Sequence, residues 1–324
     1  MVCLKNQHLS QRRGIIYQII SDIFCVILVG CGILAIKFGA KPYHRGFFCG
    51  DESIMHPVLS DTVSIALAAS VGVLLPGVVI LLCEFILRHN QEVCLIAPKT
   101  AYPRRKSWWL SAYRSLIVFV FGISVTQFLT EIGKYSIGRL RPHFLTLCKP
   151  NLSLANCADF VIDDVCTSTD SAMMTEARLS FPSGHSSFSM YCMLFLVLYM
   201  QGRLLIPKAL LLKPVAQLVV FSLGFFTCLS RISDYKHHWS DVLAGAILGM
   251  TVSVIVVVSL TDFGKTLTGR TPSSTSPDSL PESPPNMTVH SDNHSSLDYP
   301  HSHPRQTSPP RDPTSKTHIV QVEL

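Results

Sequence analysis

Three short polar clusters carry the residue types that phosphate chemistry needs, and each lies beside a long apolar stretch. Their candidate site residues are Lys134 and Arg141 in the first cluster, Ser183, Gly184 and His185 in the second, and Arg231, His237 and Asp241 in the third. Lysine and arginine bring positive charge, and the planar fork of arginine matches phosphate oxygens two at a time. The two histidines add groups that exchange protons near neutral pH. The three clusters together predict one site for an oxyanion.

The second cluster, Pro182-Ser183-Gly184-His185, has the composition of a helix start. Free backbone N–H groups and the positive end of the helix dipole favour an anion at such a start. Gly184 also lets the backbone approach a ligand closely. His185 follows directly, so we expect its imidazole beside the anion.

In the third cluster, His237 and Asp241 are four residues apart. If a helix begins near them, they share one face and can form a hydrogen bond. A carboxylate then fixes the tautomer of His237 and leaves its other nitrogen free as nucleophile or base. His238, three residues from Asp241, competes for the same carboxylate. Glu131 similarly offers Lys134 a plain ion pair.

The expected chemistry is hydrolysis of a phosphate monoester. Acid–base help supplies only about 10²–10⁴ in rate, so most of the acceleration must come from charge stabilisation and positioning. Three cations and a helix start can provide both. The chain has no Cys-x-x-Cys pair and no carboxylate cluster. We therefore expect neither a metal nor another cofactor.

The composition indicates the class of protein in which these clusters lie. Apolar residues make up 48% of the 324 residues and charged residues only 15%, against roughly 25% charged in soluble domains. A membrane-spanning helix needs about 20 mainly apolar residues. Six stretches qualify, at residues 15–36, 62–87, 112–133, 186–205, 209–230 and 239–261, the fourth being the weakest because serines begin it. The sequence therefore predicts an all-α, polytopic membrane protein with six transmembrane helices.

The predicted organisation has three parts. Residues 1–14 form a cytoplasmic leader, residues 15–262 a six-span core, and residues 263–324 a cytoplasmic tail. The tail holds half of the 20 prolines and almost no apolar run, so we expect it to be disordered. Its last residues, Val322-Glu323-Leu324, are a candidate ligand for a carboxylate-binding module by strand addition.

The orientation rests on one glycosylation sequon more than on charge, because Lys and Arg divide almost evenly between the two sides. Asn151-Leu152-Ser153 lies in the loop 134–185, whereas the sequons at Asn286 and Asn293 lie in the tail. With six spans only one set can face the lumen. We expect the loop and all three clusters outside, with Asn151 glycosylated, and the tail inside.

The cysteines and the net charge of +6 say less about function than the three clusters do. The predicted outer cysteines, Cys49, Cys148, Cys157 and Cys166, allow three full disulfide pairings. Cys3 and Cys94 lie near the membrane, where acylation and a free thiol are both open. No basic stripe or arm is present, so a nucleic-acid partner is not expected. The oligomeric state, a homo-oligomer included, stays open.

The spacing of the three clusters resembles the three-part signature of the type 2 phosphatidic acid phosphatase superfamily. Pro42 to Cys49 and the following Asp51 to Ile54 resemble the first outer loop of its lipid phosphate phosphatase branch. The resemblance covers about residues 10–262 and not the tail.

That resemblance implies roles for the candidate residues. His237 would attack phosphorus to give a phosphohistidine, Asp241 would orient it, and His185 would protonate the leaving alkoxide and then activate water. The phosphate would be bound by the remaining candidates, Lys134, Arg141, Ser183, Gly184 and Arg231. The implied reaction is metal-independent. The implied substrates are phosphatidate, lysophosphatidate, sphingosine 1-phosphate and ceramide 1-phosphate, at an outward-facing site in the plasma membrane or an internal one.

Three alternatives remain open from the sequence. A catalytically silent signalling or adhesion relative would have altered catalytic positions, whereas both histidines and all three cations are present here. A transporter would show charge at mid-membrane, and Asp22 is the main such residue. Glucose 6-phosphatase and undecaprenyl-diphosphate phosphatase share the superfamily chemistry, but the outer-loop resemblance argues against both.

Overall fold

The structure, a computed structural model, describes residues 2–89, 108–151, 159–162, 165–204, 209–262 and 264, with the backbone alone for residues 2–12, 88 and 89. By internal contacts the chain divides into Met1–Ser273 and Ser274–Leu324. The second unit lies outside the described residues, and so does the predicted disordered tail, residues 263–324, apart from Gly264.

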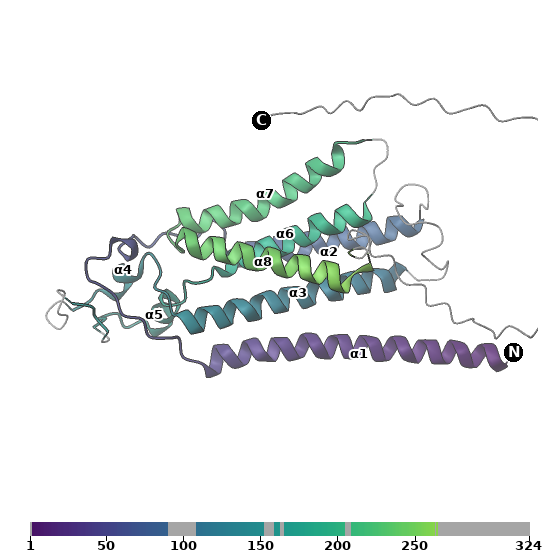
Figure 1. The fold of residues 1–324 in the computed structure, drawn as a ribbon, viewed down its shortest axis with the longest axis horizontal. Coiled ribbons are helices and arrows are strands. Elements are labelled where there is room, and N and C mark those ends of the chain that lie inside the picture. Colours follow the sequence, from purple (N-terminus) through teal and green to yellow (C-terminus); the bar gives the residue numbers. More distant parts are fainter. Residues whose placement is uncertain are drawn as a thin grey trace, which may run out of the picture. The chain divides into compact units, whose positions relative to one another are not determined.

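The first unit is helical (Figure 1). In the described residues its elements are α1 Val2–Gly39, the 3-10 turn η1 Glu52–Ile54, α2 Ile65–His89, α3 Trp108–Ile137, α4 Phe144–Cys148, α5 Ser171–Ala177, α6 Gly184–Arg203, α7 Leu212–Ser233 and α8 Trp239–Leu260. The described β-structure consists of isolated bridges, Phe47 with Val161 and Pro150 with Cys166. The predicted all-α class is confirmed.

Five helices are long and apolar enough to cross a membrane: α1, α2, α3, α7 and α8. The fourth predicted span corresponds to α6, which does not meet that measure of apolarity over the described residues. Its position explains the difference, because α6 packs against α2, α3, α7 and α8. A helix surrounded by other helices has serines and tyrosines that face protein and need not be lipid-soluble. The membrane-spanning role of α6 stays a prediction.

Helix α6 forms the centre of the bundle. Phe119 of α3 packs on Tyr191 and Phe195 of α6, with ring centroids 6.0 and 5.0 Å apart. The Tyr191 hydroxyl donates a hydrogen bond of 3.0 Å to the Phe119 carbonyl oxygen. This apolar core lies further along α6 than the polar cluster at its start, and it fixes the position of that start relative to α3.

Two glycines of α8 let that helix approach α6 closely. A Cβ added to Gly249 would lie 2.1 Å from the Ser187 carbonyl oxygen, and one added to Gly245 would lie 2.5 Å from that of Ser183. Small residues at such crossings allow helix backbones to pack together. As a result the Ser183 N–H donates a 3.0 Å hydrogen bond to the Asp241 carbonyl oxygen, which joins the second and third polar clusters.

The connections at this end of the bundle have a small core of their own. Its buried residues include Phe47, Ile54, Leu140, Phe144 and Val161. A disulfide joins Cys148 to Cys166, and Cys49 is also disulfide-bonded, whereas Cys157 lies outside the described residues. The packed loops therefore form a structured cap over the helix ends.

Candidate active site

The structure brings all three clusters to the same end of the bundle. Figure 1 shows the C-terminal ends of α3 and α7 beside the N-terminal ends of α6 and α8, next to α4 and α5. Lys134 lies in the last turn of α3 and Arg231 in the last turn of α7. Ser183 is the N-cap of α6, and His237 lies between α7 and α8.

His237 is held in one tautomer by the backbone. Its Nδ1 lies 2.7 Å from the carbonyl oxygen of Ser180, and a carbonyl oxygen can only accept a hydrogen bond. The proton therefore sits on Nδ1, and the lone pair of Nε2 is left available. The ring is only 3% exposed. His237 thus has the arrangement of a positioned nucleophile or base.

The surroundings of His237 also keep it neutral. Burial lowers its pKa well below the ordinary value, and the charges of Arg141 and Lys134 lower it further. A neutral imidazole retains the lone pair that a nucleophile requires. Its backbone N–H donates to the Arg231 carbonyl oxygen at 3.2 Å, which ties the ring to the end of α7.

The expected hydrogen bond between Asp241 and His237 is not formed between these two described residues. Helix α8 begins at Trp239, so His237 lies before it and helical spacing does not apply. Asp241 instead accepts from the N–H of His238, the N-cap residue, at 3.1 Å, and lies 3.1 Å from the His238 Nδ1. The competing residue is therefore the direct partner.

Asp241 reaches His237 through Ser180. The Ser180 hydroxyl donates to Asp241 Oδ2 at 2.6 Å and lies 3.4 Å from His237 Nδ1. The Ser180 N–H donates in turn to the Arg139 carbonyl oxygen at 2.9 Å. Arg139 completes the arrangement with an ion pair of 2.6 Å to Asp241 Oδ1. Asp241 is fully buried, so it anchors the segment that orients His237.

The sequence analysis missed Ser180 and the role of Arg139. Ser180 acts mainly through its carbonyl oxygen, which every residue has, so no sequence signal identifies it. Arg139 lies two residues before Arg141 within the first cluster. A second arginine there was a usable signal for an anchor of the buried carboxylate.

The His185 ring has one nitrogen without a partner among the described residues. Its Nε2 is buried and forms no hydrogen bond within the described part of the chain. The charges of Arg231, Arg141 and Lys134 act on this ring, and His185 in turn acts electrostatically on His237. The two imidazoles and three cations therefore share one electrostatic environment.

The start of α6 and Lys134 lie side by side. A Cβ added to Gly184 would lie 3.6 Å from Lys134 Nζ. Ser183 caps the helix, its hydroxyl accepting from the Ser186 N–H at 3.4 Å. Within the described residues, the N–H groups of Gly184 and His185 donate no hydrogen bond. These donors and the lysine can converge on one anion, as expected for a helix start.

Each predicted phosphate-binding cation is paired with a carboxylate. Lys134 Nζ lies 3.5 Å from Glu131, and Arg141 is hydrogen-bonded to Glu176. Arg141 Nε is buried and has no partner among the described residues. The Lys134–Glu131 pair was anticipated as an alternative, and it forms without removing the lysine from the site.

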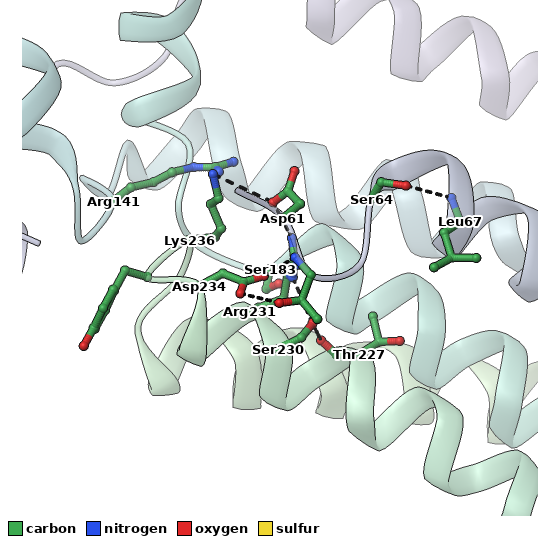
Figure 2. A network of polar contacts seen from close by, with 12 residues as sticks. Asp61, Ser64, Leu67, Arg141, Ser183, Thr227, Ser230, Arg231, Asp234 and Lys236 are labelled. Carbon is green, nitrogen blue, oxygen red and sulfur yellow. Dashed lines mark hydrogen bonds and ion pairs between the residues drawn. The ribbon is translucent and has the colours of Figure 1, made fainter. Parts of the chain in front are cut away.

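Arg231 is almost fully buried, at 1% exposed, between two carboxylates that the sequence analysis did not single out. Its Nη1 lies 2.9 Å from Asp61 and its Nη2 lies 2.8 Å from Asp234 (Figure 2). Asp234 belongs to the third cluster. Asp61 is 170 residues away in sequence and carried no local signal.

The described residues hold no group of three or more His, Cys, Asp and Glu side chains placed to bind a metal ion.

Asn151, the predicted glycosylation site, lies in the cap, where its N–H donates to the Val165 carbonyl oxygen at 2.9 Å. Leu152 and Ser153 of its sequon lie outside the described residues.

Comparison with known proteins gives the family. The model of the PAP2 superfamily matches residues 115–265, which include all three clusters. Rat phospholipid phosphatase 1 is 42% identical over 76% of this chain and 86% of its own. Mouse phospholipid phosphatase 2 is 40% identical over 84% of this chain and 95% of its own. The chain belongs to the PAP2 superfamily.

Human phospholipid phosphatase 2 is also similar to this PAP2 protein, at 41% identity over 79% of this chain and 86% of its own. No solved structure matches the chain. The resemblance inferred from the three clusters is therefore confirmed at the level of the superfamily and of its phospholipid phosphatase relatives. Five helices of sufficient length and apolarity agree with a multi-pass membrane protein.

Proposed function

We propose that this protein is an integral membrane phosphatase that hydrolyses phosphate monoesters of lipids through a phosphohistidine on His237. One observation carries the proposal: the bond from Nδ1 to the Ser180 carbonyl oxygen leaves the Nε2 lone pair free in a site with three cations. The names of the relatives support a lipid substrate.

The first chemical step forms a bond between His237 Nε2 and phosphorus and breaks the bond from phosphorus to the lipid oxygen. His185 protonates the departing alkoxide through its unpartnered Nε2. Burial and the charges of Arg231, Arg141 and Lys134 lower its pKa to about 4 in the free site, so this role requires the negative charge of the bound phosphate to keep the ring protonated. Lys134, Arg141, Arg231 and the start of α6, Ser183 and Gly184, stabilise the charge on the phosphoryl oxygens. Asp241 acts as a positioning residue through Ser180.

In the second step water attacks phosphorus and the bond from phosphorus to Nε2 breaks. His185, now neutral, takes the proton from that water, which restores its starting state. The lone pair returns to His237, and inorganic phosphate leaves. Only protein groups and water take part in these steps, so activity is expected to persist in the presence of a chelator.

An apolar cavity supports a lipid as the substrate. It has a volume of about 200 Å³ and lies between α2, α6 and α7, with Val63, Leu67, Met193, Leu223 and Phe226 among its lining residues. Val63 follows Thr62, whose hydroxyl donates to Asp234. An acyl chain in this cavity would therefore start close to the Arg231 end of the site.

The disulfide supports an outward-facing site. Disulfides persist in oxidising compartments, and Cys148–Cys166 lies in the same cap as Arg141. We therefore assign the site to the outside of the plasma membrane or to a lumen, with phosphatidate, lysophosphatidate, sphingosine 1-phosphate and ceramide 1-phosphate as the candidate substrates.

Phosphate release from lysophosphatidate by the purified full-length protein tests this function. We expect release with chelator present and its loss in His237→Ala. His44→Ala is the matched control, because His44 is an exposed histidine of the first outer loop. A wild-type protein without release would support a silent relative, and activity that vanished with chelator would contradict the mechanism.

A further inference from the structure

Asp61 lies between two cations at the edge of the site. One carboxylate oxygen, Oδ1, is 2.9 Å from Arg231 Nη1 and 3.8 Å from Lys236 Nζ. Asp61 belongs to the connection between η1 and α2, far in sequence from both cations. Figure 2 shows the side chains of Lys236 and Arg141 reaching toward Asp61. Arg141 also interacts electrostatically with this carboxylate.

The two carboxylates that hold Arg231 differ in how firmly they are fixed. Asp234 has an 8% exposed side chain and accepts two further hydrogen bonds from Thr62, one from its N–H at 2.8 Å and one from its hydroxyl at 2.7 Å. The Asp61 side chain is 38% exposed. Within the described part of the chain its hydrogen bonds and ion pairs go only to Arg231 and Lys236. Asp234 is therefore held more firmly against Arg231 than Asp61 is.

Backbone hydrogen bonds hold Lys236 beside His237. Its N–H and that of His237 both donate to the Arg231 carbonyl oxygen, at 3.1 and 3.2 Å. The preceding residue, Tyr235, has a positive φ of 51°, and its ring stacks on His56 with centroids 4.3 Å apart. This turn fixes Lys236 directly beside His237 and close to Arg231. Its side chain is only 15% exposed.

A carboxylate oxygen and a phosphate oxygen are interchangeable acceptors for arginine and lysine. The oxygen of Asp61 that both cations share therefore marks a place that a phosphoryl oxygen can take. A phosphate at this site carries more negative charge than a carboxylate and gains more from the same cations. The two anions cannot occupy the place together, because like charges at contact repel.

We propose that the substrate phosphate displaces Asp61 from Arg231 and Lys236, which makes Lys236 a fourth phosphate-binding cation and Asp61 its built-in competitor. The proposal rests on the proposed function in one respect, that phosphate binds beside His237. Asp61 returns to the cations when inorganic phosphate leaves. It therefore weakens phosphate binding, and it limits inhibition by the product.

Two variants test the exchange. Asp61→Asn removes the competing charge, so we expect the inhibition constant for inorganic phosphate and the KM for lysophosphatidate each to fall about tenfold. Lys236→Met removes a cation, so both constants should rise about tenfold. In the double variant the Asp61 change should have a smaller effect than alone, because one of the two cations it blocks is missing. Glu52→Gln is the matched control, since Glu52 is an exposed carboxylate of the same outer segment.

A binding measurement separates this proposal from the proposed function. The unfolding temperature of each full-length variant in detergent is measured against inorganic phosphate concentration, which needs no turnover. We expect phosphate to stabilise Asp61→Asn at about tenfold lower concentration than wild type. A phosphate affinity in Asp61→Asn that equals wild type or is weaker overturns the exchange. Tighter binding by a protein that hydrolyses no lipid phosphate upholds the exchange and contradicts the proposed function.

Discussion

The Nδ1 atom of His237 and the backbone carbonyl oxygen of Ser180 lie 2.7 Å apart. Because this oxygen cannot donate, the contact fixes the proton on Nδ1 without help from a side chain. The carboxylate expected to do this, Asp241, acts one step further out by holding Ser180 and His238. The orientation of His237, the proposed nucleophile, therefore depends on the fold of the segment that leads into α6.

The lowered pKa of His237 predicts how activity depends on pH. The neutral ring is the reactive form, and burial with the charges of Arg141 and Lys134 lowers its pKa. The acid limb of kcat/KM should therefore lie below about pH 6.5, the ordinary value for histidine. Lys134→Met removes one of these charges and should shift the limb to higher pH.

The control for that shift is Lys37→Met. Lys37 also lies near Glu131, at 3.9 Å, but its side chain is 51% exposed. This variant should leave the limb in place. A limb that stays fixed, or moves to lower pH, in Lys134→Met would show that Lys134 does not act on His237.

The indirect role of Asp241 predicts an order of effects. Asp241→Asn weakens the contacts to Arg139, His238 and Ser180 together, so kcat/KM should fall roughly a hundredfold. Ser180→Ala keeps the carbonyl oxygen that orients His237 and loses only the hydroxyl, so its loss should be about tenfold or less. Steady-state kinetics and the pH profile check both, with the exposed Ser233→Ala as control. A larger loss in Ser180→Ala than in Asp241→Asn would contradict this order.

The disulfide in the cap predicts a stability effect. Cys148→Ser with Cys166→Ser opens the link and should lower the free energy of unfolding by about 2–4 kcal/mol. The unfolding temperature in detergent, measured with and without reductant, checks it. Cys31→Ser is the control, since Cys31 is a free and exposed thiol of α1. An unfolding temperature that neither substitution nor reductant changes would show that the cap does not rely on this bond.

The predicted orientation is tested by glycosylation in cells. Asn151→Gln should abolish the mobility shift that a glycosidase produces on the wild-type protein, because Asn151 lies in the cap. Asn286→Gln with Asn293→Gln should leave that shift unchanged, because the tail is predicted to face the cytoplasm. The reverse pattern would place the site on the other side of the membrane.

Charge and residue type singled out the candidate site residues in the sequence. Lys134, His185 and Arg231 were chosen because an ionisable residue at the end of an apolar stretch is costly unless it has a use. The structure brings them to the same end of the bundle, and their roles stay predictions. The class of the fold followed from the lengths of the apolar stretches. The weakest stretch proved to be the central helix α6, whose polar residues are accommodated by packing against four other helices.

The sequence could not predict relations that depend on the exact start of a helix or on backbone atoms. The hydrogen bond expected between His237 and Asp241 required α8 to include His237, but the helix begins two residues later at Trp239. Ser180 acts through its carbonyl oxygen, which has no signature. Asp61 meets Arg231 because the connection that leads into α2 lies against the C-terminal end of α7, where Thr62 also bonds to Asp234.

The central claim, that His237 attacks phosphorus, is tested most directly by trapping the phosphoenzyme. Purified full-length protein is mixed with lysophosphatidate labelled in its phosphate, quenched within milliseconds in alkali, and the labelled residue is identified. We predict label on His237 that is stable in alkali and lost in acid, and no label in His237→Ala. Label on another residue, or equal label in His237→Ala, would contradict it.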